Sequence, residues 1–165
     1  MSAADAERVA EQLRAEAEAP RAGGPSVMSS LFADTIELSH VPPLPADGPI
    51  TADLLRAISA ADMTAVSGGL LDPVAEKATI TVEGSSIRIR SSFRGSLATG
   101  KPIKVDNDVL IEVREGKIVA LQGHRDEESW AQWFEVLEAG NFDPPAEWVA
   151  RGGHTPAGFR GGRRG

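Results

Sequence analysis

The stretch VDNDVLIEVREGKIVALQGHRD, residues 105–126, decides the fold of this chain. From residue 105 to residue 113, side chains that are mostly Val and Ile alternate with charged ones, which is the period of a β-strand with one buried face. Residues 114–117, which contain Gly116, predict a tight turn into a second strand that ends near His124. The hairpin has one apolar face, so it needs a layer of helices to cover that face.

Two more strands precede the hairpin. Residues 80–82, Ile-Thr-Val, lead to a turn at residues 83–85, after which Ile and Phe alternate with arginine. Thr-Gly-Lys at residues 99–101 predicts the turn into the hairpin. Residues 77–124 are therefore predicted to form a meander of four antiparallel strands, which must twist and curl as they pair. The arginines expected on its outer face, where they would pair with acids, are Arg88, Arg90 and Arg94.

Four segments repeat apolar side chains at helical spacing: residues 3–19, residues 27–32, a segment after Thr51 and a segment after Asp126. Thr51 and Asp126 are suitable N-caps, because their side-chain oxygens can accept from the first free amides of a helix. Gly140 ends the last helix. The predicted apolar stripes are Ala6, Val9, Ala10, Leu13 and Ala17; Val27, Leu31 and Phe32; Leu54, Leu55, Ile58 and Met63; and Trp130, Trp133, Phe134 and Leu137.

A separate strand lies between the helices. Residues 35–41 alternate, with Ile36, Leu38 and His40 on one face, and the prolines of residues 42–45 end the strand because they lack the amide hydrogen that a sheet ladder uses. Helices, one strand, a helix and an antiparallel meander predict the α+β class. The expected architecture is a cone-shaped, curved antiparallel sheet that is roofed by helices and encloses a cavity.

One domain is predicted, over residues 1–140, which is close to the usual size of about 100–150 residues. Residues 141–165 are rich in Pro, Gly and Arg, and every charged side chain after Glu147 is an arginine. This segment has too little apolar surface to fold alone, so we expect a flexible C-terminal tail.

The composition argues against several classes of protein. There is no cysteine, so neither a disulfide framework nor a thiolate nucleophile is expected, and the net charge of −7 disfavours nucleic-acid binding. No apolar run is long enough to span a bilayer, and residues 1–20 lack the pattern of a secretory signal, so a cytoplasmic location is expected. The three histidines, His40, His124 and His154, lack metal-ligand spacing, and no Gly-rich phosphate loop follows a strand. We therefore expect neither a metal nor a cofactor.

Three stretches resemble the SnoaL-like branch of the nuclear transport factor 2 (NTF2) superfamily. Residues 105–126 are similar to the last hairpin of that group, and residues 32–58, FADTIELSHVPPLPADGPITADLLRAI, resemble its first strand, its His- and Pro-containing loop and the following helix. ATGKP, residues 98–102, resembles the turn before the hairpin. The resemblance implies the cone shared by NTF2-like and cystatin-like proteins, a pocket for a hydrophobic small molecule, and a homodimer formed through the open sheet face.

The same resemblance offers several functions. We favour a SnoaL-like polyketide cyclase or isomerase that uses general acid/base catalysis without a cofactor. One alternative is a non-catalytic module for ligand binding or dimerisation, and a second is an epoxide hydrolase of the limonene type. A ketosteroid isomerase site uses a Tyr hydroxyl, and this chain has no Tyr. The hydrolase needs Asp, Arg and Asp inside the pocket, whereas the alternation places Arg88, Arg90, Asp106 and Asp108 outside.

Three residues are candidates for acid/base chemistry. His40 shares a strand face with two apolar residues, so its imidazole would point inward as a general base or be a hydrogen-bonded core residue. His124 lies at the end of the last strand, where a cyclase-type site would have an acid or a base. Asp126, two residues further on, would either orient His124 or cap the following helix, and the cap is the more frequent role of Asp there.

The walls of the predicted pocket follow from the same alternation. Asn107 is the polar residue on a face made of Val and Ile, so it is either a hydrogen-bond donor to a ligand or an exposed residue near the start of the strand. The residues expected to contact the ligand are Asn107, Val109, Ile111, Leu38 and Trp130.

Overall fold

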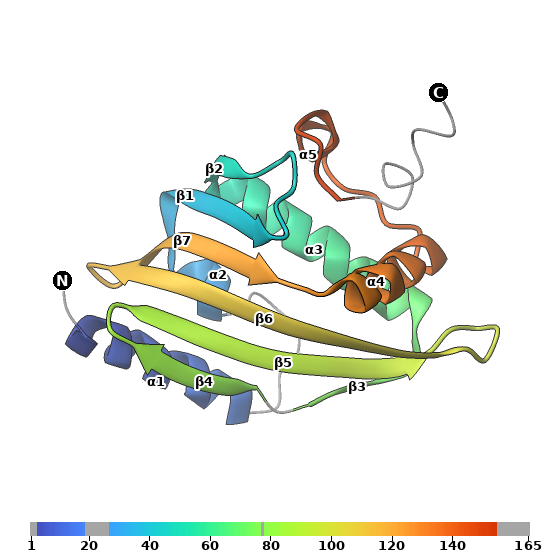
Figure 1. The fold of residues 1–165 in the computed structure, drawn as a ribbon, viewed down its shortest axis with the longest axis horizontal. Coiled ribbons are helices and arrows are strands. Elements are labelled where there is room, and N and C mark those ends of the chain that lie inside the picture. The colour runs from blue at the N-terminus through green and yellow to red at the C-terminus, as the bar shows by residue number, and fades with distance from the viewer. Residues whose placement is uncertain (1–2, 19–26, 77, 155–165) are drawn as a thin grey trace.

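A curved sheet with helices on one side forms the centre of the molecule (Figure 1). The computed structural model describes residues 3–18, 27–76 and 78–154, and within these ranges the sheet has seven strands. Their order is β2-β1-β7-β6-β5-β3, and β4 also pairs with β5. All pairs are antiparallel except β1 with β7. The strands are β1 Phe32–Val41, β2 Gly48–Thr51, β3 Leu71–Ala75, β4 Thr79–Glu83, β5 Ser86–Ser96, β6 Pro102–Arg114 and β7 Lys117–His124.

Five helices are present in the described ranges: α1 Ala3–Glu18, α2 Val27–Ser30, α3 Ala52–Gly69, α4 Glu127–Ala139 and α5 Ala146–Ala150. Both predicted N-caps are confirmed. The hydroxyl of Thr51 accepts from the Leu54 amide at 3.2 Å, and the carboxylate of Asp126 accepts from the Ser129 amide at 2.7 Å. Among the described helices, none combines the length and the apolar character that crossing a bilayer requires.

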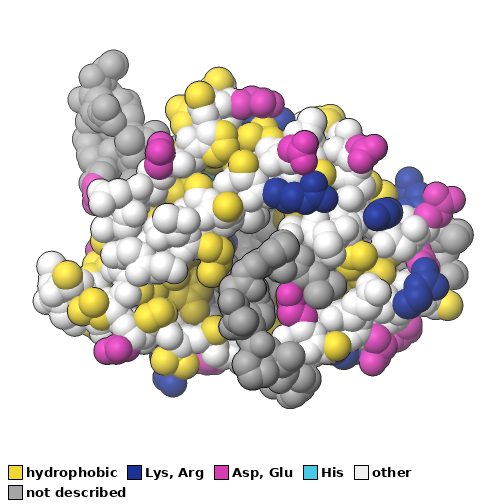
Figure 2. All heavy atoms as spheres, turned by 180° about the vertical axis from the view of Figure 1, so that it is seen from behind, with side chains coloured by type: hydrophobic (Ala, Val, Ile, Leu, Met, Phe, Trp, Pro, Cys, Tyr) yellow, Lys and Arg dark blue, Asp and Glu magenta, His cyan; other side chains and the backbone are white. Residues whose placement is uncertain are grey.

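Strand β6 shows how the sheet acquires two different faces. Val105, Ile111 and Val113 are buried under the helices, while Lys104 and Asp106 are exposed on the opposite side. We call the helix-covered side the inner face and the other side the outer face. This confirms the predicted alternation and the predicted α+β cone. Seen from behind, most of the visible Lys and Arg side chains lie in one half of the surface, whereas apolar side chains are spread over both halves (Figure 2).

Two apolar clusters hold the helices on the inner face. The larger joins α1 and α3 to β1, β5, β6 and β7, and the smaller lies between α3, α4 and the other end of β6. Full burial of a side chain such as Ile111 or Val136 contributes roughly 1.5–3 kcal/mol. The two clusters leave the middle of the inner face between them, and the candidate site lies there.

The structure corrects several sequence-based expectations. Strands β2 and β3 were not predicted, Phe32 begins β1 instead of continuing a helix, and Ala17 and Met63 are exposed. The short strands are missed because β2 has four residues and every residue of β3 is exposed, so neither shows a long alternation. Lys77, residues 19–26 and residues 155–165 lie outside the described residues.

Residues 141–154, the described part of the segment expected to be a tail, pack against the domain. Trp148 of α5 is 1% exposed and belongs to the larger apolar cluster, and Arg151 donates to the carbonyls of Ala46 and Pro49 at 2.8 and 2.9 Å. Glycine here serves close packing: a Cβ at Gly153 would collide with the Trp148 ring. The domain therefore extends past residue 140.

Candidate functional site

Two hollows lie on opposite sides of strands β6 and β7. The outer one is an open groove of about 720 Å³, and the inner one is a more enclosed cavity of about 210 Å³ between the sheet and helices α3, α4 and α5. Their chemistry differs, and the difference decides which of them is the candidate site.

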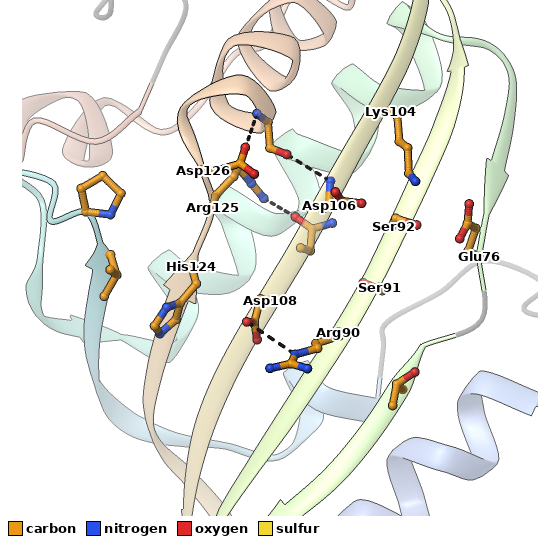
Figure 3. A pocket seen from close by; sticks show the side chains of 15 residues that line it. Glu76, Arg90, Ser91, Ser92, Lys104, Asp106, Asp108, His124, Arg125 and Asp126 are labelled. Carbon is orange, nitrogen blue, oxygen red and sulfur yellow. Dashed lines mark hydrogen bonds and ion pairs between the residues drawn. The ribbon is translucent and has the colours of Figure 1, made fainter.

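The outer groove has charged walls, and Arg90 and Asp108 among its lining residues form an ion pair with each other (Figure 3). Arg88 donates to both carboxylate oxygens of Asp108 at 2.9 and 3.1 Å, and Arg90 lies 3.7 Å from the same carboxylate. These contacts confirm for Arg88 and Arg90 that arginines of β5 pair with acids across the sheet. A ligand in this groove would have to compete with ion pairs that the protein makes for itself.

The inner cavity has apolar and aromatic walls. Three tryptophans contribute to it, together with aliphatic side chains from β1, β6, β7 and α3. Polar side chains reach the cavity between these apolar walls, as small-molecule sites need for orienting a ligand. Its aromatic and aliphatic lining comprises Leu38, Leu55, Ile58, Val109, Leu121, Trp130, Trp133 and Trp148, and its polar lining includes His40, Ser59, Asp62, Asn107, Arg125 and His154.

His40 points into this cavity from β1 and is held by Asp47. The Nδ1 atom of His40 lies 2.6 Å from Oδ1 of Asp47, and the other oxygen of Asp47 accepts from the amides of His40 and Leu44 at 3.1 Å each. The proline loop therefore returns a carboxylate to the strand that it follows. With Asp47 accepting the Nδ1 hydrogen, Nε2 of the neutral imidazole carries the lone pair.

Burial lowers the pKa of His40 from its ordinary value. The hydrogen bond and the charge of Asp47 oppose this shift, and the nearby His154 and Arg125 add to it. The side chain of His40 is 13% exposed. His40 is therefore neutral near pH 7 and is able to accept a proton.

Arg125 follows β7 and lies on the inner side. Its guanidinium stands over the rings of Trp130 and Trp133, 4.6 and 4.9 Å from their centroids, and donates to the side-chain oxygen of Asn107 (Figure 3). Burial lowers the pKa of Arg125 to about 10, while the charge of Asp62 opposes the shift. A cation is thus held at the cavity wall by a neutral amide and two aromatic rings.

His154 closes the cavity from the C-terminal segment. Its Nε2 lies 3.2 Å from the carboxylate of Asp62 on α3, and its ring stacks on Phe142 with centroids 5.5 Å apart. The side chain of His154 is 8% exposed. Asp62 and His154 form a second His–Asp pair on the same cavity as His40 and Asp47.

Unsatisfied polar atoms also gather around this cavity. Within the described part of the chain, three buried side-chain polar atoms lack a hydrogen-bond partner: Nε of Arg125, Nε1 of Trp133 and Nδ1 of His154. All three residues line the inner cavity. Buried polar groups are normally paired, so this concentration marks the inner cavity as the candidate site.

The predicted site residues divide between the two faces. Leu38, His40, Asn107, Val109 and Trp130 line the inner cavity. Ile111, also predicted to contact ligand, is fully buried in the core beside it. Asp126 is exposed on the outer side, where it caps α4.

His124 borders both hollows, but its side chain belongs to the outer face. It pairs in register with Asp108, and its Nε2 lies 2.7 Å from Oε1 of Gln122, two residues earlier on the same face. The reason is a β-bulge: Ile118 and Ala120 pair with consecutive residues of β6, so Val119 is extra. One extra residue reverses the alternation beyond it, which turns His124 outward and Arg125 inward.

Sequence reasoning missed Asp47, Asp62, Arg125, Trp148 and His154. The only signal for Asp47 was its position in the proline-containing loop that follows His40. The position of Arg125 depends on the bulge, and those of Asp62, Trp148 and His154 depend on how residues 141–154 pack. In the described ranges no group of three His, Asp or Glu side chains is arranged to hold a metal ion.

No family model and no curated protein sequence matches this chain. Solved structures do: the chain is similar to an NTF2-like protein from Burkholderia thailandensis, with 18% identity over 76% of this chain and 94% of that protein and a TM-score of 0.53. A protein with a cystatin-like fold from Xanthomonas campestris has 14% identity, coverages of 78% and 95%, and a TM-score of 0.54. PrhC from Penicillium brasilianum has 12% identity, coverages of 83% and 92%, and a TM-score of 0.54. At these identities the likeness concerns the fold.

Proposed function

We propose that this chain, which has the NTF2-like cone fold, binds a hydrophobic small molecule in its inner cavity and transfers a proton beside a carbonyl group, as a cyclase or an isomerase. One observation carries the proposal: an inward-facing histidine, His40, is held by the carboxylate of Asp47 at 2.6 Å on the wall of an apolar cavity. This is the arrangement of a general base and the group that orients it.

The proton transfer follows from the contacts of these two residues. Asp47 accepts the Nδ1 hydrogen and so fixes the tautomer in which Nε2 of His40 is the base. Nε2 removes a proton from the carbon next to a carbonyl group, and the electron pair of the broken C–H bond moves into the carbonyl oxygen to give an enolate. Return of the proton to another carbon gives an isomer. Alternatively, the enolate carbon attacks a second carbonyl to close a ring, and the alkoxide that forms takes the proton back from the imidazolium of His40.

The same cavity offers stabilisation for the enolate oxygen. Asn107, whose oxygen accepts from Arg125, has its amide nitrogen left as a donor, and the contact with Arg125 holds that amide in place. Both residues line the cavity with His40. Apolar walls keep water from competing for such hydrogen bonds, which is the condition in which fixed donors stabilise a developing charge most.

The alternative is binding without turnover. The three tryptophans that line the cavity favour a binding protein, since large aromatic surfaces bind hydrophobic ligands without any catalytic group. An epoxide hydrolase receives less support: Arg88 and Arg90 lie on the outer face, and the carboxylates that accompany Arg125 inside, Asp47 and Asp62, are each bound to a histidine.

Homodimerisation through the outer face also belongs to the proposal. The outer face of β5 and β6 is uncovered by helices and carries both Arg90 and Asp108, so two copies have complementary charges to exchange. Sedimentation velocity of the full chain distinguishes a dimer from a monomer, and an Arg90→Glu variant should shift a dimer formed this way toward monomer.

The proton-transfer test needs no knowledge of the natural substrate. Hydrophobic ketones and 1,3-diketones are incubated with the full chain in D₂O, and exchange of their α-protons is followed by NMR. Wild type should accelerate exchange, and His40→Gln should reduce the acceleration by about 10²- to 10⁴-fold, which is the usual contribution of a positioned base. His124→Gln is the matched control on the outer face and should leave the acceleration unchanged.

Two outcomes would count against the proposal. If His124→Gln abolishes exchange while His40→Gln does not, the base lies on the outer face. If the ketones bind, as seen by calorimetry, but wild type accelerates no exchange, the inner cavity is a binding site without catalysis.

A further inference from the structure

Arg125 is a half-buried cation that borders both hollows and that the protein leaves incompletely paired. Among the described residues no carboxylate oxygen lies within ion-pair distance of its guanidinium, and its single hydrogen bond goes to the neutral oxygen of Asn107. The Nε hydrogen is buried and has no acceptor in the described part of the chain. A guanidinium carries five N–H donors, and the one hydrogen bond found here leaves donors free for a ligand. Burying such a group is costly unless a counter-ion and acceptors are supplied.

The surroundings fix the plane of the guanidinium without neutralising it. Trp130 and Trp133 contact it at 4.6 and 4.9 Å from their ring centroids, so its orientation is set by aromatic rings. The acid that influences its charge, Asp62, is bound to His154 at 3.2 Å. The fork of donors is thus rigid and charged, and it belongs to a residue that lines an apolar cavity.

We infer that the ligand of the inner cavity is a hydrophobic carboxylate, whose carboxylate group pairs with Arg125 while its apolar body contacts the tryptophan walls. A planar guanidinium matches a carboxylate in geometry and charge and can bind it through two parallel hydrogen bonds. The inference rests on the proposed function in one respect, that the ligand occupies the inner cavity, and it does not require His40 to act as a base.

Two features support a carboxylate over a neutral polar group. A neutral carbonyl or hydroxyl would leave the charge of Arg125 buried and unpaired, whereas a carboxylate neutralises it. The burial that lowers the pKa of Arg125 to about 10 shows that its surroundings among the described residues disfavour the charge, so a bound anion gains the interaction that the protein lacks. The ligand would also make Arg125 harder to deprotonate.

The test compares three ligands that share one body: 2-naphthoate, 2-naphthamide and 2-naphthylmethanol. Isothermal titration calorimetry of the full wild-type chain at pH 7 should show the carboxylate binding about 10- to 100-fold more tightly than the amide, which is the usual value of hydrogen bonds to a charged group. This comparison uses no variant, so it holds even if a substitution at Arg125 prevents folding. Equal affinity for acid and amide, or no binding of any of the three up to millimolar concentration, would overturn the inference.

Two variants test whether the preference for the carboxylate over the amide comes from Arg125. Arg125→Gln should reduce the acid-to-amide ratio to about one, whereas Arg88→Gln, the matched change on the outer face, should leave the ratio as in wild type. A preference that survives in a folded Arg125→Gln variant would place the carboxylate elsewhere and would overturn the inference.

The same series separates this inference from the proposed catalysis. His40→Gln should keep the acid-to-amide ratio even though it loses proton exchange. Loss of exchange with the ratio retained supports both ideas; a normal ratio with no exchange in wild type refutes the catalysis alone; exchange without any acid preference refutes the carboxylate site alone.

Discussion

Arg88 and Arg125 lie on opposite faces of one sheet and have opposite electrostatic surroundings. Arg88 has Asp108 at 2.9 and 3.1 Å and Glu83 at 3.1 Å, and these hydrogen bonds raise its pKa. Arg125 has an amide oxygen and two indole rings, and burial lowers its pKa to about 10. The charge of Arg88 is therefore neutralised by carboxylates of the same chain, whereas the charge of Arg125 is not.

The difference shows where folding and binding have separate requirements. Every partner that lowers the energy of Arg88 is part of the protein, so that pair needs nothing further. On the inner face Arg125, Trp133 and His154 keep buried polar atoms without partners, and such atoms reduce stability unless a ligand engages their groups. A local loss of folding stability of this kind is typical of a site that must bind another molecule.

The largest expected effect tests whether the C-terminal segment is part of the inner face. Trp148→Ala should lower the free energy of unfolding by about 3–5 kcal/mol, because it removes a fully buried ring from the core and the cavity wall and the hydrogen bond from Trp148 to the carbonyl of His154. Urea unfolding followed by far-ultraviolet circular dichroism measures the change.

The neighbouring position provides the control for this prediction. Val149 is 50% exposed, so Val149→Ala should change the free energy of unfolding by less than about 0.5 kcal/mol. If Trp148→Ala is as mild as Val149→Ala, residues 141–154 are a dispensable appendage and His154 has no role in the inner cavity.

Most of the fold could be predicted from sequence because its elements have long and clean periodicities. Strand β6, with Val105, Ile111 and Val113 alternating with charged residues, fixes the two faces of the sheet, and the caps Thr51 and Asp126 fix the starts of α3 and α4. A five-residue helix such as α5 has no such period. Its main indication in the sequence was Trp148, a large apolar residue among Pro and Gly.

The site was predictable only as far as the alternation holds. The alternation of β1 puts His40 on the same face as Leu38, but the bulge at Val119 reverses the alternation of β7 and exchanges the faces of His124 and Arg125. Nothing in the hairpin sequence marks the extra residue. The pairing of His154 with Asp62 joins residues 92 positions apart, and such a contact follows only from the packed fold.

The next prediction uses pH to separate the inner histidine from the rest of the molecule. Because the folded pKa of His40 lies below its ordinary value of about 6.5, the unfolded state binds this proton more readily. His40 therefore lowers stability as the pH falls from about 6.5 through its folded pKa. Wild type should lose more stability than His40→Gln between pH 7 and pH 5.

The charged groups around His40 determine how a substitution would alter this pH dependence of stability. Asp47 raises the pKa of His40, while His154 and Arg125 lower it. Asp47→Asn should therefore lower the pKa further and extend the loss of stability to more acidic pH. Chemical denaturation at half-unit pH steps measures both effects, and identical pH profiles for wild type and His40→Gln would show that His40 is not protonated on unfolding.

The smallest effect concerns Asp126, which stands on the outer side next to the inward-facing Arg125. Its carboxylate accepts from the Ser129 amide at 2.7 Å as the N-cap of α4, so Asp126→Ala should cost about 1 kcal/mol of stability. The acid-to-amide preference of the ligands should not change, because Asp126 does not line the inner cavity. Thr51→Ala at the start of α3 is the matched cap and should cost a similar amount. A loss of ligand preference in a stably folded Asp126→Ala variant would mean that the cap sets the position of Arg125, and the two faces of the sheet would then act as one site.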